Sequence, residues 1–257
     1  MPEHDLALLQ DAAVSAGKIA LRYWKHAPKV WDKGEAGPVT EADLAVNEML
    51  QSTLQSARPG YGWLSEETPD SPARLDCEYT FIIDPIDGTR AFIADEKHFA
   101  HSLAIARNGQ IIAACVYLPA LDRLYTASSH SQALCNGAPV KASARAEVDG
   151  ATLLTPKANM AAEFWRGPAP NITRAFRASI AYRLCLVAEG SFDGVLTFRP
   201  VWEWDSAAGA LIAARAGAAV TDRYGGALRY NTGQAQSQGL FAAAPALHSS
   251  LIAQMQP

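Results

Sequence analysis

The sequence predicts an α+β protein, because helical patterns open the chain, antiparallel strands follow, and helices and strands mix in the second half. Apolar residues recur at helical spacing from Leu6 to Trp24 and again from Val46 to Leu54. With 257 residues, of which 49% are hydrophobic, the chain is long enough to bury a large core. We therefore expect one sizeable domain or two fused lobes.

The second predicted helix has a start signal of its own. Thr40 and Asp43 have the spacing of a capping box, in which two side chains satisfy free backbone N–H groups at a helix N-terminus. The helix should therefore begin at these residues and continue through the apolar positions 46–54.

Strand patterns dominate the next part of the chain. Residues 79–83 are apolar and β-prone, so they should form a buried strand that ends at Asp84. Residues 102–107 have the alternating pattern of a strand, and Asn108-Gly109 is a strong hairpin signal. Residues 111–117 should therefore form the second, antiparallel strand of the hairpin. Residues 123–126 add one more strand, so this part predicts an antiparallel meander. Further on, we expect helices at 182–188 and 206–216, the second ended by Gly217.

Composition excludes several classes of protein. The formal net charge of −4 gives no electrostatic reason to expect an obligate nucleic-acid partner. No run of about 18 apolar residues would span a membrane, and the N-terminal segment lacks the pattern of a signal peptide. The four cysteines are scattered without a Cys-x-x-Cys pair, which argues against a zinc site or a redox dithiol. We expect a cytoplasmic protein with no membrane partner and with buried thiols.

The most informative segment for function is 84–89, with the sequence Asp-Pro-Ile-Asp-Gly-Thr. Pro85 fixes φ and Gly88 permits a positive φ, so the chain should turn sharply after the strand. Both carboxylates and a backbone carbonyl can then point at one hard cation, while the amides of Gly88 and Thr89 face an anion. The pattern indicates a metal and phosphate site, although alone it could also be an ordinary Asp- and Gly-rich turn.

Three other acidic segments stand beside predicted strand or helix ends, at residues 39–43, 63–68 and 204–209. Singly, each has a structural explanation as a helix cap, as exposed loop glutamates or as solvated charge. Their recurrence at element ends suggests one shared site.

Together the four segments resemble those of the inositol monophosphatase family, lithium-sensitive, metal-dependent phosphatases that include the 3′(2′),5′-bisphosphate nucleotidases. The matching pieces are Thr-x-x-Asp at 40–43, Glu-Glu at 66–67, Asp-Pro-Ile-Asp-Gly-Thr at 84–89 and Trp-Asp-x-Ala-Ala-Gly at 204–209. The resemblance implies a layered α-β-α-β-α sandwich. An N-terminal α+β lobe of residues 1–140 would carry most metal ligands, and a C-terminal α/β lobe of residues 141–257 would carry Asp205 and substrate contacts, within one catalytic unit.

The resemblance also implies a metal-ligand set. Glu66, Asp84 and the carbonyl of Ile86 would bind one Mg²⁺. Asp84, Asp87 and Asp205 would bind a second. This set agrees with the chemistry of Mg²⁺, which is held by a few carboxylates together with water and substrate phosphate oxygens. Two or three ions are expected, with Mn²⁺ able to substitute and with Ca²⁺ and Li⁺ as inhibitors.

The reaction implied is hydrolysis of a small phosphate ester by a metal-activated water. Thr89, hydrogen-bonded to Asp43, would orient the water, and Glu66 would act as the base. The phosphate would meet the amides of Gly88 and Thr89. The candidates for substrate contact are Lys33, Arg183 and Glu189. His98 and His101 form a His-x-x-His pair at the start of a predicted strand, and we assign no metal to them.

The substrate stays open among three phosphate esters. Segments 65–67, 185–190 and 203–205 look more like the branch that hydrolyses adenosine 3′(2′),5′-bisphosphate. Arg90, directly after Thr89, departs from that branch and from typical inositol phosphatases, and is similar to the residue in histidinol-phosphate phosphatases. We expect a Mg²⁺-dependent phosphomonoesterase acting on inositol monophosphate or adenosine 3′(2′),5′-bisphosphate, with histidinol phosphate as the alternative.

A second class of function also stays open. Some bacterial relatives act on RNA-polymerase-associated complexes, so the chain could be mainly a regulatory or binding protein of the same fold. Against this, every predicted metal carboxylate is present, and clustered carboxylates repel one another unless a cation compensates them. The sequence leaves a homodimer open.

Overall fold

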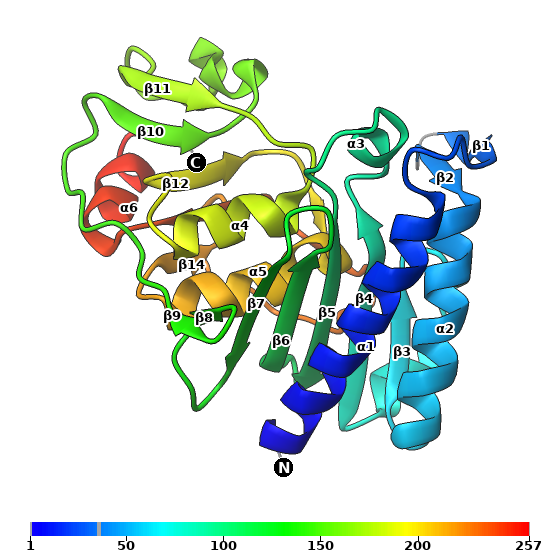
Figure 1. Cartoon of the computed structure of the whole chain (residues 1–257). Coiled ribbons are helices and arrows are strands. Elements are labelled where there is room, and N and C mark those ends of the chain that lie inside the picture. The colour runs from blue at the N-terminus through cyan, green and yellow to red at the C-terminus, as the bar shows by residue number, and fades with distance from the viewer. Residues whose placement is uncertain (1, 35–36, 257) are drawn as a thin grey trace.

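The computed structural model describes residues 2–34 and 37–256, and it has the predicted layered α-β-α-β-α architecture (Figure 1). Helices α1 and α2 cover one face of a seven-stranded sheet. Helices α4 and α5 lie between that sheet and a five-stranded sheet, and α6 lies at the outer side of the smaller sheet. The helices are α1 (Pro2–Tyr23), α2 (Glu41–Ala57), α3 (Thr89–Ile93), α4 (Ile180–Ala188), α5 (Glu203–Arg215) and α6 (Pro245–Ile252).

The larger sheet contains the predicted meander. Its strands, in spatial order, are β3 (Gly62–Ser65), β4 (Tyr79–Asp87), β5 (Ala100–Arg107), β6 (Gln110–Leu118), β7 (Arg123–Ser128), β8 (Leu134–Cys135) and β9 (Ala138–Pro139). β3 and β4 are parallel, and the other neighbours are antiparallel. Asn108 (φ 49°) and Gly109 (φ 79°) form the expected two-residue turn between β5 and β6.

The smaller sheet lies entirely in the second half of the chain. In spatial order its strands are β11 (Ile172–Ala175), β10 (Ala151–Leu154), β12 (Gly194–Thr197), β16 (Leu240–Ala243) and β14 (Ala219–Thr221). The remaining short elements are β1 (Val30–Asp32), β2 (Pro38–Thr40), β13 (Val201–Trp202), β15 (Gln236–Ser237), η2 (Pro72–Asp76), η3 (Lys157–Met160) and η4 (Ala162–Phe164). The division of the chain into lobes at residues 140 and 141 stays a prediction.

The predicted helices are present, but two begin earlier than expected. Thr40 caps α2, and the reciprocal hydrogen bonds of its capping box with Asp43 are both formed. Helix α4 begins at Ile180 rather than Tyr182, because Ser179 caps it. Helix α5 begins at Glu203, three residues before the expected Ser206.

Apolar side chains fill the spaces between the layers. Leu9, Leu50 and Phe81 belong to the core between the outer helices and the larger sheet, while Leu184 and Ile212 belong to the core around α4 and α5. A third core joins the smaller sheet to α6. Within residues 2–34 and 37–256, the helices are too short or too polar to cross a bilayer.

Helices α4 and α5 approach each other closely at Gly209. A Cβ atom at this position would lie 2.7 Å from the Cβ of Leu184 and 3.1 Å from the carbonyl oxygen of Ala181. Neither atom can move without moving α4. The missing side chain therefore lets α5 lie directly against α4.

We expect Gly209→Ala to destabilise the protein by about 1–3 kcal/mol, because the added methyl group overpacks this contact. Helix propensity acts in the opposite direction, since Ala is favoured over Gly by about 0.8–1 kcal/mol in a helix interior. Urea unfolding measures the net effect. The control is Ala214→Gly at an exposed position of the same helix, which should cost about 1 kcal/mol through propensity alone. A Gly209→Ala protein more stable than the wild type would contradict the close contact.

Candidate functional site

β4 continues to Asp87, three residues beyond Asp84, where the sequence predicts its end, and the chain turns at Gly88. β4 pairs with β5 up to Asp84, the pairing resumes at Asp87, and the register shifts between them. Gly88 follows with φ 98°, and a Cβ there would lie 3.2 Å from the carbonyl oxygen of His98. This position therefore suits glycine on both backbone and steric grounds. The bulge and the glycine direct both aspartates to one side of the turn.

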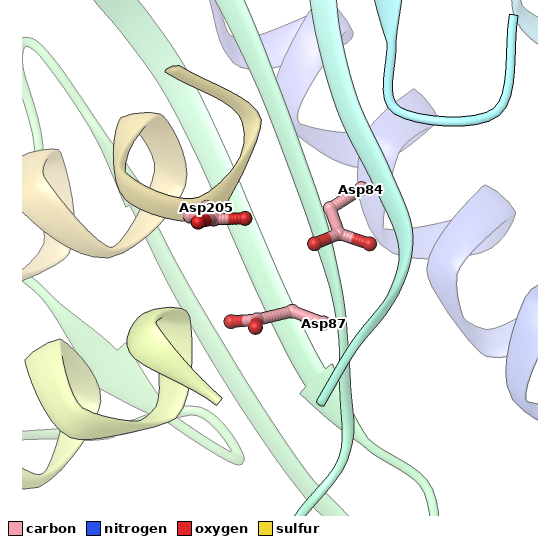
Figure 2. Close-up of side chains that lie close together, drawn as sticks. All are labelled: Asp84, Asp87 and Asp205. Atoms are coloured by element: carbon pink, nitrogen blue, oxygen red, sulfur yellow. The ribbon is translucent and has the colours of Figure 1, made fainter. Parts of the chain in front are cut away.

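Three carboxylates from two distant segments meet at this turn. Asp84 and Asp87 come from β4, and Asp205 comes from the first turn of α5 (Figure 2). One oxygen of each carboxylate lies within 4.8 Å of the corresponding oxygens of the other two. Asp84 and Asp87 are buried, and Asp205 is partly buried. We call these three residues the aspartate cluster.

The aspartates differ in how their oxygens are satisfied. Oδ2 of Asp87 accepts hydrogen bonds from Ser179 Oγ and from the backbone N–H of Ala181, both at 2.7 Å. Oδ1 of Asp84 is buried and has no hydrogen-bond partner among the described residues. A buried carboxylate oxygen without a donor is costly, so this atom fits a role as a cation ligand.

Electrostatics support the same conclusion. Burial, together with the charges of Glu66, Asp87 and Asp205, raises the pKa of Asp84 well above its usual value. Burial and the charge of Asp87 likewise raise the pKa of Asp205. Ionised carboxylates this close repel one another in a site of low polarity. The donor set, which consists of oxygens only, fits a hard divalent cation that would remove the repulsion.

Glu66 and Lys33 complete one side of the site. Glu66 follows β3, lines the same cavity as the aspartate cluster, and accepts a hydrogen bond from Lys33 Nζ at 3.2 Å. The same ammonium group binds Glu67 at 2.7 Å. Burial raises the pKa of Glu66 to about 7, although the charge of Lys33 acts in the opposite direction. Lys33 therefore lies beside a predicted metal ligand.

Thr89 and Asp43 meet as the resemblance implies. Oγ1 of Thr89 lies 3.2 Å from Oδ1 of Asp43 and 3.1 Å from the carbonyl oxygen of Ile86, so its single proton can be donated to either. Burial raises the pKa of Asp43 to about 6. The same Asp43 caps α2, so one carboxylate serves both the helix and the site.

The start of α5 is held by contacts from distant segments. Ser102 Oγ on β5 donates to the carbonyl of Trp204 at 2.8 Å. The buried carboxylate of Glu203 accepts from the backbone N–H groups of Asn231 and Thr232 at 2.6 and 2.9 Å. The guanidinium of Arg74 in η2 binds both of these loop residues as well. These bonds fix the first helical turn, and with it Asp205, to the larger sheet.

The aspartate cluster opens into a cavity of about 340 Å³, which we call the central cavity. It is lined by Gly37, Pro38, Glu66, Asp84, Asp87, Gly88, Thr89, Arg90, Phe176, Ala178, Arg183, Arg199 and Asp205. Most of the predicted site residues are therefore brought together. Glu189 is placed elsewhere: its carboxylate accepts from Arg123 and from Tyr125, the latter at 2.6 Å, between β7 and the end of α4.

A second cavity of about 570 Å³, the side cavity, shares Phe176, Arg183 and Arg199 with the central cavity. The guanidinium carbon of Arg183 lies 4.3 Å from the centre of the Phe176 ring. Arg183 is buried, whereas Arg199 and Phe176 are exposed. Burial lowers the pKa of Arg183 to about 10, so it stays charged at neutral pH. The wall between the two cavities is therefore cationic and aromatic.

The two histidines of the His-x-x-His pair have other partners. The ring of His98 stacks on that of Tyr182, with centroids 5.7 Å apart. His101 is fully buried, and its Nδ1 is hydrogen-bonded to the carbonyl of Pro85. Burial lowers the pKa of His101 to about 4, so its ring is neutral at physiological pH.

Sequence reasoning missed Ser179, Phe176 and Arg199. Ser179 directly precedes the apolar run of α4, so its role as the N-cap of that helix could have been predicted from the sequence. Its hydrogen bond to Asp87 spans 92 residues and leaves no local signal. Phe176 and Arg199 stand in segments without a motif, and only the fold brings them to the cavity.

The chain is similar to known proteins over most of its length. The model of the inositol monophosphatase family matches residues 1–257. The inositol-1-monophosphatase of Rhizobium meliloti is 34% identical over 233 residues, covering 86% of each chain. The Nus factor SuhB of Vibrio cholerae is 33% identical over 246 residues, covering 91% of this chain and 89% of that protein.

Solved structures agree. The extragenic suppressor protein suhB from Bartonella henselae superposes with a TM-score of 0.83 at 29% identity, with 97% of each chain covered. The IMPase of Thermotoga maritima also gives a TM-score of 0.83, at 25% identity, covering 98% of this chain and 96% of that one. The motifs, the layered fold and the meeting of the acidic residues agree with these similarities, and the chain belongs to the inositol monophosphatase family.

Proposed function

We propose that the protein is a Mg²⁺-dependent phosphomonoesterase whose substrate carries a second anionic group, as adenosine 3′(2′),5′-bisphosphate does. The observation that carries the hydrolytic function is the aspartate cluster, in which a buried Asp84 oxygen lacks a donor among the described residues. Family membership supports phosphatase activity. The choice of metal, the residue roles and the substrate are the proposed parts.

Asp84, Asp87 and Asp205, with Glu66 and the carbonyl of Ile86, would hold the Mg²⁺ ions. Carboxylate and carbonyl oxygens suit this hard ion, and no histidine among the described residues belongs to the aspartate cluster or lines the central cavity. When bound, such ions polarise a phosphoryl group and stabilise the attacking and leaving oxygens.

The chain's own residues would orient the water and take up its proton. Thr89 donates its proton to Asp43 or to the Ile86 carbonyl, so its oxygen lone pairs are left to accept from a water molecule. Glu66 lines the central cavity beside the aspartate cluster and is the proposed acceptor of this proton. Burial raises its pKa to about 7 in the metal-free protein, and a bound cation would favour the ionised form that accepts a proton. The amides of Gly88 and Thr89 are the proposed donors to the phosphate.

The cationic wall favours a substrate with a second negative charge. Among the described residues, neither Arg183 nor Arg199 forms an ion pair with a carboxylate. The exposed Arg199 can bind phosphate through paired N–H donors. Arg183 already donates to the carbonyls of Arg177 and Ala178 and chiefly adds charge. The exposed ring of Phe176 offers a surface for a planar ring. Inositol monophosphate has neither feature, and the amine of histidinol phosphate would be repelled by the arginines. The adenosine bisphosphate has both features.

A second candidate function is regulatory. It is favoured by the similarity to the Nus factor SuhB of Vibrio cholerae, at 33% identity. Such a role would not require the aspartate cluster. Full cellular function of an Asp84→Asn protein would favour this candidate over the enzyme.

We expect Mg²⁺ to stabilise the protein more at about pH 8 than at about pH 5.5. Burial raises the pKa of Glu66 from 4.5 to about 7 in the metal-free protein. The folded state therefore favours the protonated acid, and this contribution to stability is complete below pH 4.5 and is lost as the pH rises through about 7. A bound cation offsets that loss. At about 100 times Kd, Mg²⁺ should add about 2.7 kcal/mol, or roughly 5–10 °C in Tm, at the higher pH.

Asp205→Asn tests whether Asp205 is a metal ligand, in the same thermal-shift experiment. Removing one of the repelling charges should raise the metal-free Tm and reduce the response to Mg²⁺. The control is Asp76→Asn in η2, an exposed carboxylate outside the site, which should leave both quantities unchanged. An Asp205→Asn protein with the wild-type Mg²⁺ response would remove Asp205 from the metal site.

Thr89→Ala should lower kcat by about 100-fold or more with little change in KM, because a group that orients water acts mainly in the transition state. Thr89→Ser keeps the hydroxyl and should retain most of the turnover. Phosphate release under saturating Mg²⁺ measures both variants. Equal losses in the two variants would point to packing rather than to the hydroxyl group.

Adenosine 3′,5′-bisphosphate should be hydrolysed with a higher kcat/KM than inositol 1-phosphate or histidinol phosphate. Arg199→Gln should reduce kcat/KM for the bisphosphate by about 10- to 100-fold, the value of one charge-assisted hydrogen bond. The same substitution should change kcat/KM for inositol 1-phosphate and histidinol phosphate little. Arg174→Gln, an exposed arginine on β11, is the control. Preference for inositol 1-phosphate would overturn the proposal that the substrate carries a second anionic group. It would leave the proposed phosphatase activity standing.

A further inference from the structure

We propose that His101 is a positioning residue of the metal centre, which sets the affinity of the turn 84–87 for Mg²⁺ through its hydrogen bond to the carbonyl of Pro85. The inference rests on the proposed function only in taking Mg²⁺ as the bound ion. His101 does not touch the ion or the substrate. It acts through the backbone between two of the three members of the aspartate cluster.

The register of the sheet explains why this carbonyl needs a partner. Asp84 pairs with Ser102, and Asp87 pairs with Ala100, so two residues of β4 face the single residue His101. Pro85 has no N–H, and the bulge interrupts the ladder of backbone hydrogen bonds at this point. The Nδ1 atom of His101 supplies the contact. A carbonyl only accepts, so the proton of the neutral ring lies on Nδ1.

Packing alone does not account for an imidazole at this position. His101 is fully buried, and its Nε2 has no hydrogen-bond partner among the described residues. The aromatic ring of Tyr117, at 6.4 Å between centroids, is a neighbour on the same side of the sheet. Burying an unpaired ring nitrogen costs about 1–3 kcal/mol, a cost that an apolar side chain would avoid. The feature that distinguishes histidine here is its Nδ1–H group.

The hydrogen bond fixes the rotation of the Pro85–Ile86 peptide. The side chain of Asp84, the carbonyl of Ile86 and the side chain of Asp87 all lie within two residues of the fixed carbonyl. Mg²⁺ demands nearly octahedral ligands at about 2.0–2.1 Å, whereas Ca²⁺ accepts irregular sets of six to eight oxygens. Loss of the hydrogen bond should therefore weaken binding of Mg²⁺ more than binding of Ca²⁺.

The experiment compares three substitutions by calorimetric titration of the purified protein with Mg²⁺ and with Ca²⁺. In His101→Asn the amide nitrogen can take the place of Nδ1, whereas in His101→Gln it reaches the place of Nε2. His101→Val has no polar group. We expect Gln and Val to lower Mg²⁺ affinity by about 10- to 100-fold, with a smaller loss for Ca²⁺, and Asn to stay within about threefold of the wild type.

The outcomes separate this inference from the proposed function. Wild-type Mg²⁺ affinity in His101→Gln, or an equal loss in Asn and Gln, would overturn the positioning role while leaving the metal site intact. Equal losses for Mg²⁺ and Ca²⁺ would also overturn it, because general loosening of the fold acts on both ions. Should the Val protein fail to fold, the Asn and Gln pair still carries the test. A wild-type protein that binds no Mg²⁺ would overturn the metal assignment itself.

Discussion

The mutual repulsion of three aspartates, two of them buried and one partly buried, is the constraint on which the rest of the structure depends. Asp84, Asp87 and Asp205 are brought within 4.8 Å of one another in a setting where burial already opposes ionisation. A flexible chain would relieve this repulsion by moving the carboxylates apart. The fold prevents that movement by placing each one on a strand or a helix that is itself packed between two layers.

The two aspartates of β4 have different environments. One oxygen of Asp87 is engaged by the N-terminal residues of α4, so this carboxylate also joins the larger sheet to the interlayer helix. Oδ1 of Asp84 is buried and has no hydrogen-bond partner among the described residues, which suits it to contact a cation. The opposite side of the central cavity is cationic, through Arg183 and Arg199. Charge therefore changes sign across a cavity of about 340 Å³.

Signals between neighbouring residues were enough to predict most of the helices and strands and the turn that follows β4. The hairpin at Asn108, the cap of α2 at Thr40 and the glycine at the end of the turn depend on neighbours in the chain, and all three were found. The start of α5 was placed too late, because Trp202 has no capping side chain and the first turn is held by Ser102 and by residues 231–232 instead. The contact with Ser102 spans 102 positions and those with residues 231–232 span 28 and 29, and no periodicity or propensity encodes them.

Helix α5 packs on strands of both sheets, and this has a consequence for how the chain can be divided. It contacts β4 to β7 of the larger sheet and β14 and β16 of the smaller one. The loop at 231–232 also joins its first turn to Arg74. A fragment that ended before α4 would expose an apolar sheet face to water, which favours aggregation. Separate halves of this protein are therefore poor units for recombination, and loss of α5 would expose both sheets at once.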